Sequence, residues 1–403
     1  MAEKNTRTPL MDAVHSLNSY KGVMTPWNKL ISQYEAYQYA LRHNASIASA
    51  FMQVLRIMIP DYTTRSDALC DINKDIYKTI YSDPVFQEQF RDRNCVPPFV
   101  SGPMIGVLQG DQGDESLWMA GRVNDYGTYR FEKELDSCPW DIVGSEYCRC
   151  TTCFFQAQGE AFGPNMEFNM IEAKGCGDLH CRVVGEDRIK YPMPPRKHSS
   201  DTLGPIATMD EVKYTPEEKC YKDPQFYRPE CNGIYRNGFC AEWTTDEQYS
   251  FATPMPLGSN NIIPVLYAMC DMETTERVTK CIFEAAGKMA FSEFAAIKGI
   301  RDWLGVPGDV NDGRVLGALI EVVLQSTLIN YQVVQFDEEA AIYDINLAGI
   351  QREMPLLTTA YMSLWFGMCK TLVGTMWAAW RETENVPEGV LRFKIAKKID
   401  KYC

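Results

Sequence analysis

One order of structural elements occurs twice along this sequence, and such a repeat leaves a chain few ways to fold. In the first half, helical periodicity covers 27–59 and 68–81, and two alternating runs meet near Tyr126. A helix that ends at Gly163 then precedes a β-hairpin. The order is therefore two helices, two strands, one helix and two strands.

The second half repeats this order. Helical patterns cover 277–305 and 313–326, and a strand pattern covers 330–345. A further helix at 356–374 precedes a final hairpin at 376–398. The Met and aromatic residues of that helix are typical of core packing or of a subunit interface, so a homo-oligomer is one expectation.

Identical residues recur in the two halves at two different distances along the sequence. Tyr126 and Phe131 correspond to the same residue types 205 positions later. Met166, Glu172 and Arg182 correspond to identical residues 210 positions later. Two different separations imply a five-residue insertion between the matched segments.

We therefore predict an α+β fold made of two similar lobes that arose by a degenerate internal duplication, each with helices packed on an antiparallel sheet. The Cys-containing lobe at 1–190 is expected to hold the functional site. A long irregular linker rich in Pro and Tyr covers 191–270, and the degenerate second lobe covers 271–403.

Charge and hydropathy restrict the partners. The net charge of −13 and the pI near 5.0 argue against binding to nucleic acid or anionic membranes. No stretch of about 18 apolar residues is long enough to span a bilayer. The first twenty residues do not resemble a signal peptide, so the expected location is the cytoplasm, where cysteines stay reduced.

Five cysteines occur within 34 residues, in "YCRCTTC" and "GCGDLHC". This number of thiolates suits a tetrahedral zinc ion or an iron-sulfur cluster, although several of the cysteines are equally well read as small buried apolar residues. On a helix Cys150 and Cys153 share one face and Cys148 points away. The predicted metal ligands are therefore Cys150, Cys153, Cys176 and Cys181, and Cys148 is expected to be dispensable.

In the second half the positions of these cysteines hold other residues. At a separation of 210, the counterparts of Cys148, Cys150, Cys153 and Cys181 carry no thiol; they are Thr358, Ala360, Ser363 and Leu391. The chemistry is therefore expected in the first lobe, with the second lobe as scaffold.

A cysteine nucleophile is the alternative to a metal. Cys153 would attack an sp² carbon, and His180 or Glu160 would act as its base. Glu172 lies in an otherwise apolar strand and would serve as a metal ligand or general base. Arg182 would orient a substrate carboxylate.

The segment from about residue 100 to 190 resembles the 4-vinyl-reductase domain and the related L-2-amino-thiazoline-4-carboxylate hydrolase family. The matching residues are Cys153 in a helix, Glu172 on a strand and the hairpin sequence "GDLHCR" at 177–182. The first family implies a structural zinc beside a small-molecule pocket. The second implies hydrolysis of a thiazoline ring. One difference from the zinc pattern is that Cys176 directly precedes the hairpin glycine.

Three functions follow from these observations. The favoured one is hydrolysis of a C–N or C–S bond in a small, sulfur-containing ring. The second is a non-catalytic small-molecule sensor with a structural zinc. The third is an accessory subunit that carries an iron-sulfur cluster for an anaerobic enzyme.

Overall fold

The computed structural model describes residues 22–84, 121–126, 130–135, 138, 140–162, 165–192, 257–292 and 294–398. Predictions that fall on other residues, including most of the linker at 191–270, lie outside this part of the chain. The described elements of the first half are β1 (Val23–Met24), β2 (Leu30–Ile31), α2 (Gln33–Met58), α3 (Tyr62–Tyr81), β3 (Gly121–Tyr126), β4 (Arg130–Leu135), η1 (Asp141–Val143), α6 (Ser145–Phe162), β5 (Met166–Glu172), η2 (Lys174–Cys176) and β6 (Cys181–Asp187). Those of the second half are α10 (Leu257–Met269), α11 (Met272–Ala290), α12 (Phe294–Leu304), α13 (Arg314–Ser326), β7 (Tyr331–Phe336), β8 (Ala340–Asn346), α14 (Leu347–Gln351), α15 (Pro355–Met368), η4 (Cys369–Val373), β9 (Trp377–Glu382) and β10 (Val390–Lys397).

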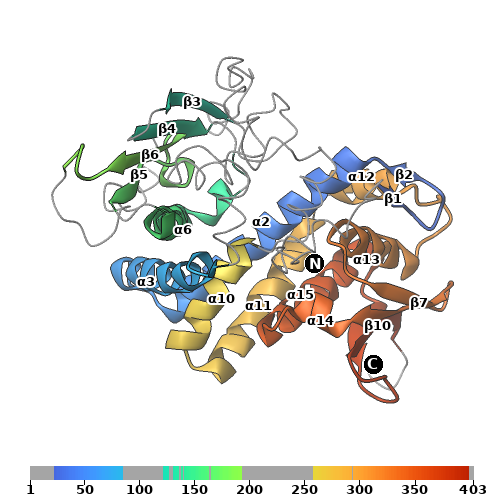
Figure 1. The fold of residues 1–403 in the computed structure, drawn as a ribbon. Helices are drawn as coiled ribbons and strands as arrows, with labels where there is room; N and C mark the ends of the chain where they lie inside the picture. The colour runs from blue at the N-terminus through green and yellow to red at the C-terminus, as the bar shows by residue number, and fades with distance from the viewer. Residues whose placement is uncertain are drawn as a thin grey trace, which may run out of the picture.

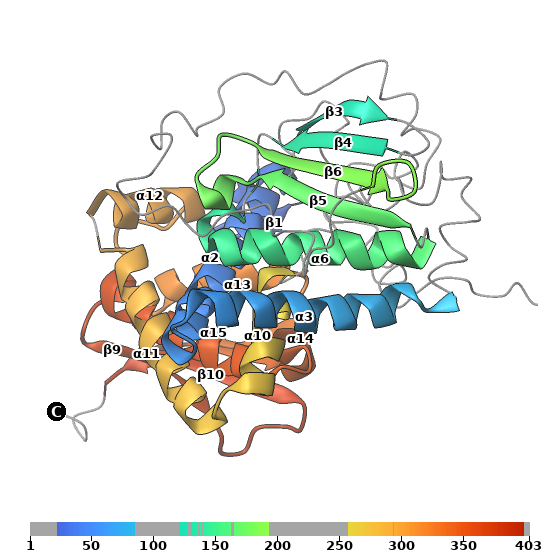
Figure 2. The ribbon, with the colours of Figure 1, turned by 90° about the vertical axis from the view of Figure 1, so that its left-hand side faces the viewer.

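The protein has an α+β architecture with two four-stranded antiparallel sheets on opposite sides of a helical centre (Figure 1). Figure 2 shows the layers on one side, where the sheet of β3 to β6 lies above α6 and α6 lies above α3. On the other side α15 and α13 pack against the sheet of β7 to β10. The helices therefore form the middle of the molecule, and each sheet covers them from outside.

The two sheets have the same strand order. It is β3-β4-β6-β5 in the first and β7-β8-β10-β9 in the second. Gly121 pairs with Leu135 and Tyr331 with Ile345, so the first strands are related by 331 − 121 = 210 positions. A β-bulge occurs at the same place in both, between Val123 and Asp125 in the first sheet and 210 positions later in the second.

This register corrects the separation of 205 for the first pair of strands. One separation of 210 relates β3 and β4 to β7 and β8, and it also relates Cys181 of β6 to Leu391 of β10. No insertion between the matched segments is required. The Tyr and Phe identities at 205 misled the alignment because aromatic residues are common in strands.

The helices of the two halves are related by the same separation of 210 positions. α3 begins after Asp61, whose carboxylate caps the helix by accepting the N–H of Thr64. α11 begins after Asp271, which caps in the same way through Thr274. The first residues of α6 and α15 are 210 positions apart. Along the chain, α6 precedes β5 and α15 precedes β9.

Helices α2 and α10 pack against each other at the centre of the molecule. α2 begins with a capping box between Ser32 and Glu35, and Pro60 follows its end. The presence of α10 corrects the predicted linker, because residues 257–269 form a helix whose Ile262 and Ile263 are fully buried. Apolar side chains drew this segment into the core although Pro264 lies within it.

The long aromatic helix of the second half belongs to the core. On α15 the side chains of Tyr361, Leu364 and Trp365 are buried, which confirms the core alternative for this segment. α15 crosses α11 with almost no space between their backbones. A Cβ atom on Gly287 would lie 2.1 Å from the carbonyl oxygen of Leu364, and one on Gly367 would lie 2.2 Å from that of Glu284. Only glycine fits at these two positions.

His43 of α2 is buried between Tyr39 and Tyr361, and burial lowers the pKa of its imidazole to about 4. In the unfolded chain the imidazole of His43 is protonated as the pH falls below about 6.5, whereas in the folded protein it stays neutral until about pH 4. We expect this residue alone to lower the free energy of unfolding by on the order of 3 kcal/mol as the pH falls through that window.

A His43→Phe variant tests this expectation, because phenylalanine keeps the ring and cannot be protonated. Urea unfolding at several pH values should show a shallower loss of stability below pH 6.5 in the variant than in the wild-type protein. Parallel pH profiles for the two proteins would contradict a neutral buried imidazole.

Candidate functional site

Helix α6 separates the cysteines into two groups. Cys150 and Cys153 lie on one face, where both are electrostatic neighbours of Cys70 on α3. The Cys150 thiol also points to the carbonyl oxygen of Leu69, with 3.7 Å from sulfur to oxygen. The shared face of Cys150 and Cys153 is therefore confirmed, and that face is covered by a helix.

Cys148 lies on the other face of α6, as expected, and there it meets the hairpin. Its electrostatic neighbours are Cys181, Cys176 and Cys138. We call Cys138, Cys148, Cys176 and Cys181 the thiol centre. The predicted metal group, Cys150 and Cys153 with Cys176 and Cys181, is thus divided between two places, and the supposedly dispensable Cys148 is the helix residue that faces the hairpin.

The hairpin tip is a tight turn. η2 ends at Gly177, which has a left-handed φ of 97°, and Asp178 accepts the backbone N–H of Ala173 at 3.0 Å. In a regular strand Cys176 and Cys181, five positions apart, would lie on opposite faces, but the turn interrupts the strand between them. Both residues therefore reach the same side, toward Cys148.

Backbone N–H groups point at the sulfur atoms of the centre. Lys174 donates its N–H to Sγ of Cys181 at 3.3 Å, and Gly175 donates to Cys148. The N–H of Trp140 acts in the same way on Cys138. Hydrogen bonds of this kind favour the thiolate form. Gly175 also leaves room for the sulfur, because a Cβ atom there would lie 2.5 Å from Sγ of Cys148.

Burial acts in the opposite direction and is the larger effect. It raises the pKa of Cys176 to about 12 and that of Cys181 to about 11, and it raises the pKa of Cys138 and Cys148 well above its ordinary value. At neutral pH the four cysteines are therefore thiols, and none of them is an activated nucleophile. In the described segments, no three Cys, His, Asp or Glu side chains lie close enough together to hold a metal ion.

The four predicted catalytic residues are not brought together. Cys153 lies on the α3 side of α6. Arg182 follows Cys181 on β6, so its side chain projects from the opposite face of the sheet, where it donates to Glu132 at 2.7 Å. Glu172 pairs with Arg182 in register and shares that face.

The remaining predicted groups lie apart as well. His180 is half-buried in the turn before Cys181. Glu160 forms an ion pair with Lys74 of α3 at 3.1 Å, on the other side of α6. The second sheet repeats the pair of Glu172 and Arg182 as Glu382 and Arg392, although that sheet has no cysteines on the matching strand. A repeated pair of this kind points to a role in sheet structure.

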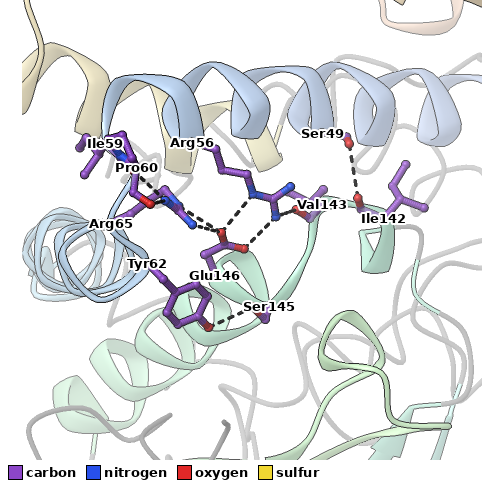
Figure 3. Close-up of polar contacts among 10 residues, drawn as sticks. All are labelled: Ser49, Arg56, Ile59, Pro60, Tyr62, Arg65, Ile142, Val143, Ser145 and Glu146. Atoms are coloured by element: carbon purple, nitrogen blue, oxygen red, sulfur yellow. Dashed lines mark hydrogen bonds and ion pairs between the residues drawn. The ribbon is translucent and has the colours of Figure 1, made fainter. Parts of the chain in front are cut away.

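A buried ion cluster holds the thiol helix in place, and it was not anticipated from the sequence. Glu146, in the first turn of α6, is fully buried and forms ion pairs with Arg65 of α3 at 2.7 Å and Arg56 of α2 at 2.8 Å (Figure 3). Arg56 also donates to the carbonyl oxygen of Val143. Three helices therefore meet at one carboxylate, whose pKa the two guanidinium groups lower against the effect of burial.

The second half has an uncharged version of this cluster. At a separation of 210, Arg56, Arg65 and Glu146 correspond to three buried residues without charge, which are Leu266, Thr275 and Leu356. Glu146 lies two residues before Cys148, and its counterpart in the second half is Leu356. This difference between the halves is a sequence signal that could have drawn attention to Glu146.

Fold and site define an α+β protein in which two antiparallel sheets enclose helices and one sheet carries a thiol-rich turn. Comparison with protein-family models, curated proteins and solved structures finds no match to this chain. None of the described helices is both long and apolar enough to cross a membrane.

Proposed function

We propose that the thiol centre binds a zinc ion, which stabilises the first half as a non-catalytic small-molecule-binding module. The ligands are Cys138, Cys148, Cys176 and Cys181. Four cysteines are the ligand set of many structural zinc sites, and coordination deprotonates thiols whose ordinary pKa is too high. The ion would tie α6 to the hairpin and to the segment before η1.

One observation carries this proposal, namely the backbone N–H groups that point at the sulfur atoms. A buried thiol needs no such donors, whereas a metal-bound thiolate is stabilised by them. Lys174 and Gly175 supply two donors from consecutive residues of the turn. Cys148 interacts electrostatically with the other three cysteines, so the four thiols share one region of the fold and are the candidates for a common metal ion.

Metal analysis of single variants tests the proposal. Protein purified anaerobically is expected to contain one zinc per chain, and cobalt substitution should give the absorption of a tetrahedral thiolate site. Cys148→Ser and Cys181→Ser should lose the metal. Cys150→Ser and Cys153→Ser are matched controls from the other face of α6 and should keep it.

The opposite pattern would contradict this assignment. If Cys153→Ser lost the metal while Cys148→Ser kept it, the ligand set expected from the sequence would be correct. Iron with acid-labile sulfide in the purified protein would favour the iron-sulfur alternative. Protein without any bound metal, after purification in zinc-containing buffer, would reject a metal centre.

Hydrolysis of a C–N or C–S bond remains a separate prediction, and it rests on the resemblance to the thiazoline carboxylate hydrolases. The placement of the three residues gives it no support, since Cys153 faces α3 while Glu172 and Arg182 are paired in the sheet. Turnover of 2-aminothiazoline-4-carboxylate by the metal-loaded protein, lost in Cys176→Ser, would restore the enzyme hypothesis.

We also infer that the two halves arose by internal duplication. The equal strand order, the shared bulge and the constant separation of 210 support this view. The repeat includes α10 with the second half, so the boundary between the halves falls before residue 257. The reduced thiols required at the centre support a cytoplasmic location.

A further inference from the structure

β7 forms one edge of the second sheet. The strand order is β7-β8-β10-β9, so among the described strands β7 pairs with β8 alone (Figure 1). The side chains at its middle are open to solvent, with Val333 41% and Val334 48% exposed. An edge strand presents a row of N–H and C=O groups that can pair with a strand of another chain.

The sequence of β7 lacks the residues that usually protect such an edge. Charged side chains and proline discourage pairing with another strand, and "YQVVQF" contains neither. The opposite edge of the same sheet is β9, which carries Arg381 and Glu382. β7 is therefore the edge of this sheet that is better suited to accept a further strand.

β7 also reads nearly the same in both directions, as aromatic, Gln, Val, Val, Gln, aromatic. In an antiparallel pair of two β7 strands, related by a two-fold axis between the valines, Tyr331 would face Phe336 of the partner subunit. The two glutamines would face each other, and so would the two valines. Aromatic and β-branched pairs across antiparallel strands are stabilising, so this strand is complementary to itself.

The β-bulge makes this pairing geometrically consistent. Residues that face each other across two strands project from the same face of the sheet. In a regular strand Tyr331 and Phe336 would project from opposite faces, because they are five positions apart. The bulge between Val333 and Gln335 adds one residue, so both aromatic residues lie opposite buried residues of β8 on the inner face. The two glutamines share the outer face in the same way.

The acidic character of the chain does not oppose this arrangement. Asp337, Glu338 and Glu339 directly follow β7, and the chain carries a net charge of −13. The two-fold axis places these acidic turns at opposite ends of the paired strands. They would lie about 20 Å apart, well beyond the Debye length of about 8 Å at physiological ionic strength.

Apolar side chains on the neighbouring hairpin enlarge the surface. Trp27, between β1 and β2, contacts Phe336 with ring centroids 6.1 Å apart. On the same hairpin Met24 is 50% and Leu30 is 59% exposed. A stable interface buries about 800 Å² on each subunit, which is more than one pair of short strands provides, so these residues would contribute to it.

We propose that two copies of this chain associate through β7, so that their second sheets join into one continuous sheet of eight strands. The contact is isologous, because the same strand serves both subunits. This interface is distinct from α15, whose aromatic residues are buried in the core. It is also independent of the thiol centre and of zinc.

Sedimentation equilibrium of the full chain tests the proposal. The wild-type protein is expected to be a dimer with twice the 45.9 kDa of one chain. Gln332→Lys combined with Gln335→Lys places like charges opposite each other at two symmetric contacts, and it should weaken dimerisation about tenfold. Val334→Lys, at the centre of the pair, should act in the same direction. Circular dichroism should show that these variants stay folded.

Gln332→Lys combined with Gln335→Glu is the matched control. It introduces the same number of charges but places lysine opposite glutamate, so it should dimerise like the wild-type protein. A double-lysine variant that dimerises normally, or equal weakening in both double variants, would overturn the proposal. A monomeric wild-type protein would also overturn it, and an extended peptide bound to such a monomer would assign β7 to a different partner.

Discussion

Replacing Glu146 by alanine is expected to lower the free energy of unfolding by about 3–5 kcal/mol. The carboxylate is fully buried and is the shared partner of Arg65 and Arg56. Its removal leaves two guanidinium groups at the junction of α2, α3 and α6 without an anion, and Arg65 is itself only 7% exposed. Urea unfolding, followed by circular dichroism and tryptophan fluorescence, measures the loss.

The second half supplies the matched control for this prediction. A triple variant with Arg56→Leu, Arg65→Thr and Glu146→Leu installs the residues found 210 positions later, which pack without charge. Replacing a whole buried ion cluster by apolar residues is often neutral or stabilising, whereas breaking it is not. The triple variant should therefore be more stable than Glu146→Ala, and the reverse order would show that the uncharged version does not fit here.

The second large effect is expected at the crossing of α11 and α15. Gly287→Ala should cost about 3 kcal/mol, because the new methyl group would meet a backbone oxygen that no side-chain rotation can move. Gly367→Ala meets the same obstacle from the other helix. The helices would have to separate, and the core of the second half would loosen with them.

Gly299→Ala is the control for this second prediction. Gly299 lies within α12 and a Cβ atom there meets no other atom within 4 Å. Alanine should stabilise this helix by about 0.5–1 kcal/mol. Thermal melting of the three variants gives the comparison, and a wild-type melting temperature for Gly287→Ala would mean that the two helices are not in such close contact.

Much of the fold was accessible from the sequence because its elements have clear periods and clear ends. Helical periodicity and strand alternation predict α2, both hairpins and the cysteine helix close to their observed positions. α10 was missed, since Pro264 and its polar first turn obscure a helix that exists through burial against α2. Long-range packing of this kind leaves no local signal.

The site was predicted only in part. The helical period correctly placed Cys150 and Cys153 on one face and Cys148 on the other. The helical period could not show which face of the helix the hairpin covers. In the structure the hairpin covers the face that carries Cys148. The turn at Gly177 also decided that Cys176 and Cys181 reach the same side, because it is not part of a regular strand.

By itself, the sequence determined most of the helices and strands, their order and the faces that the cysteines occupy, because these follow from local periodicity. Only the tertiary structure decided which faces meet. The buried carboxylate of Glu146 acquires its significance there, since the energy of a charge depends on the groups that surround it after the helices have packed.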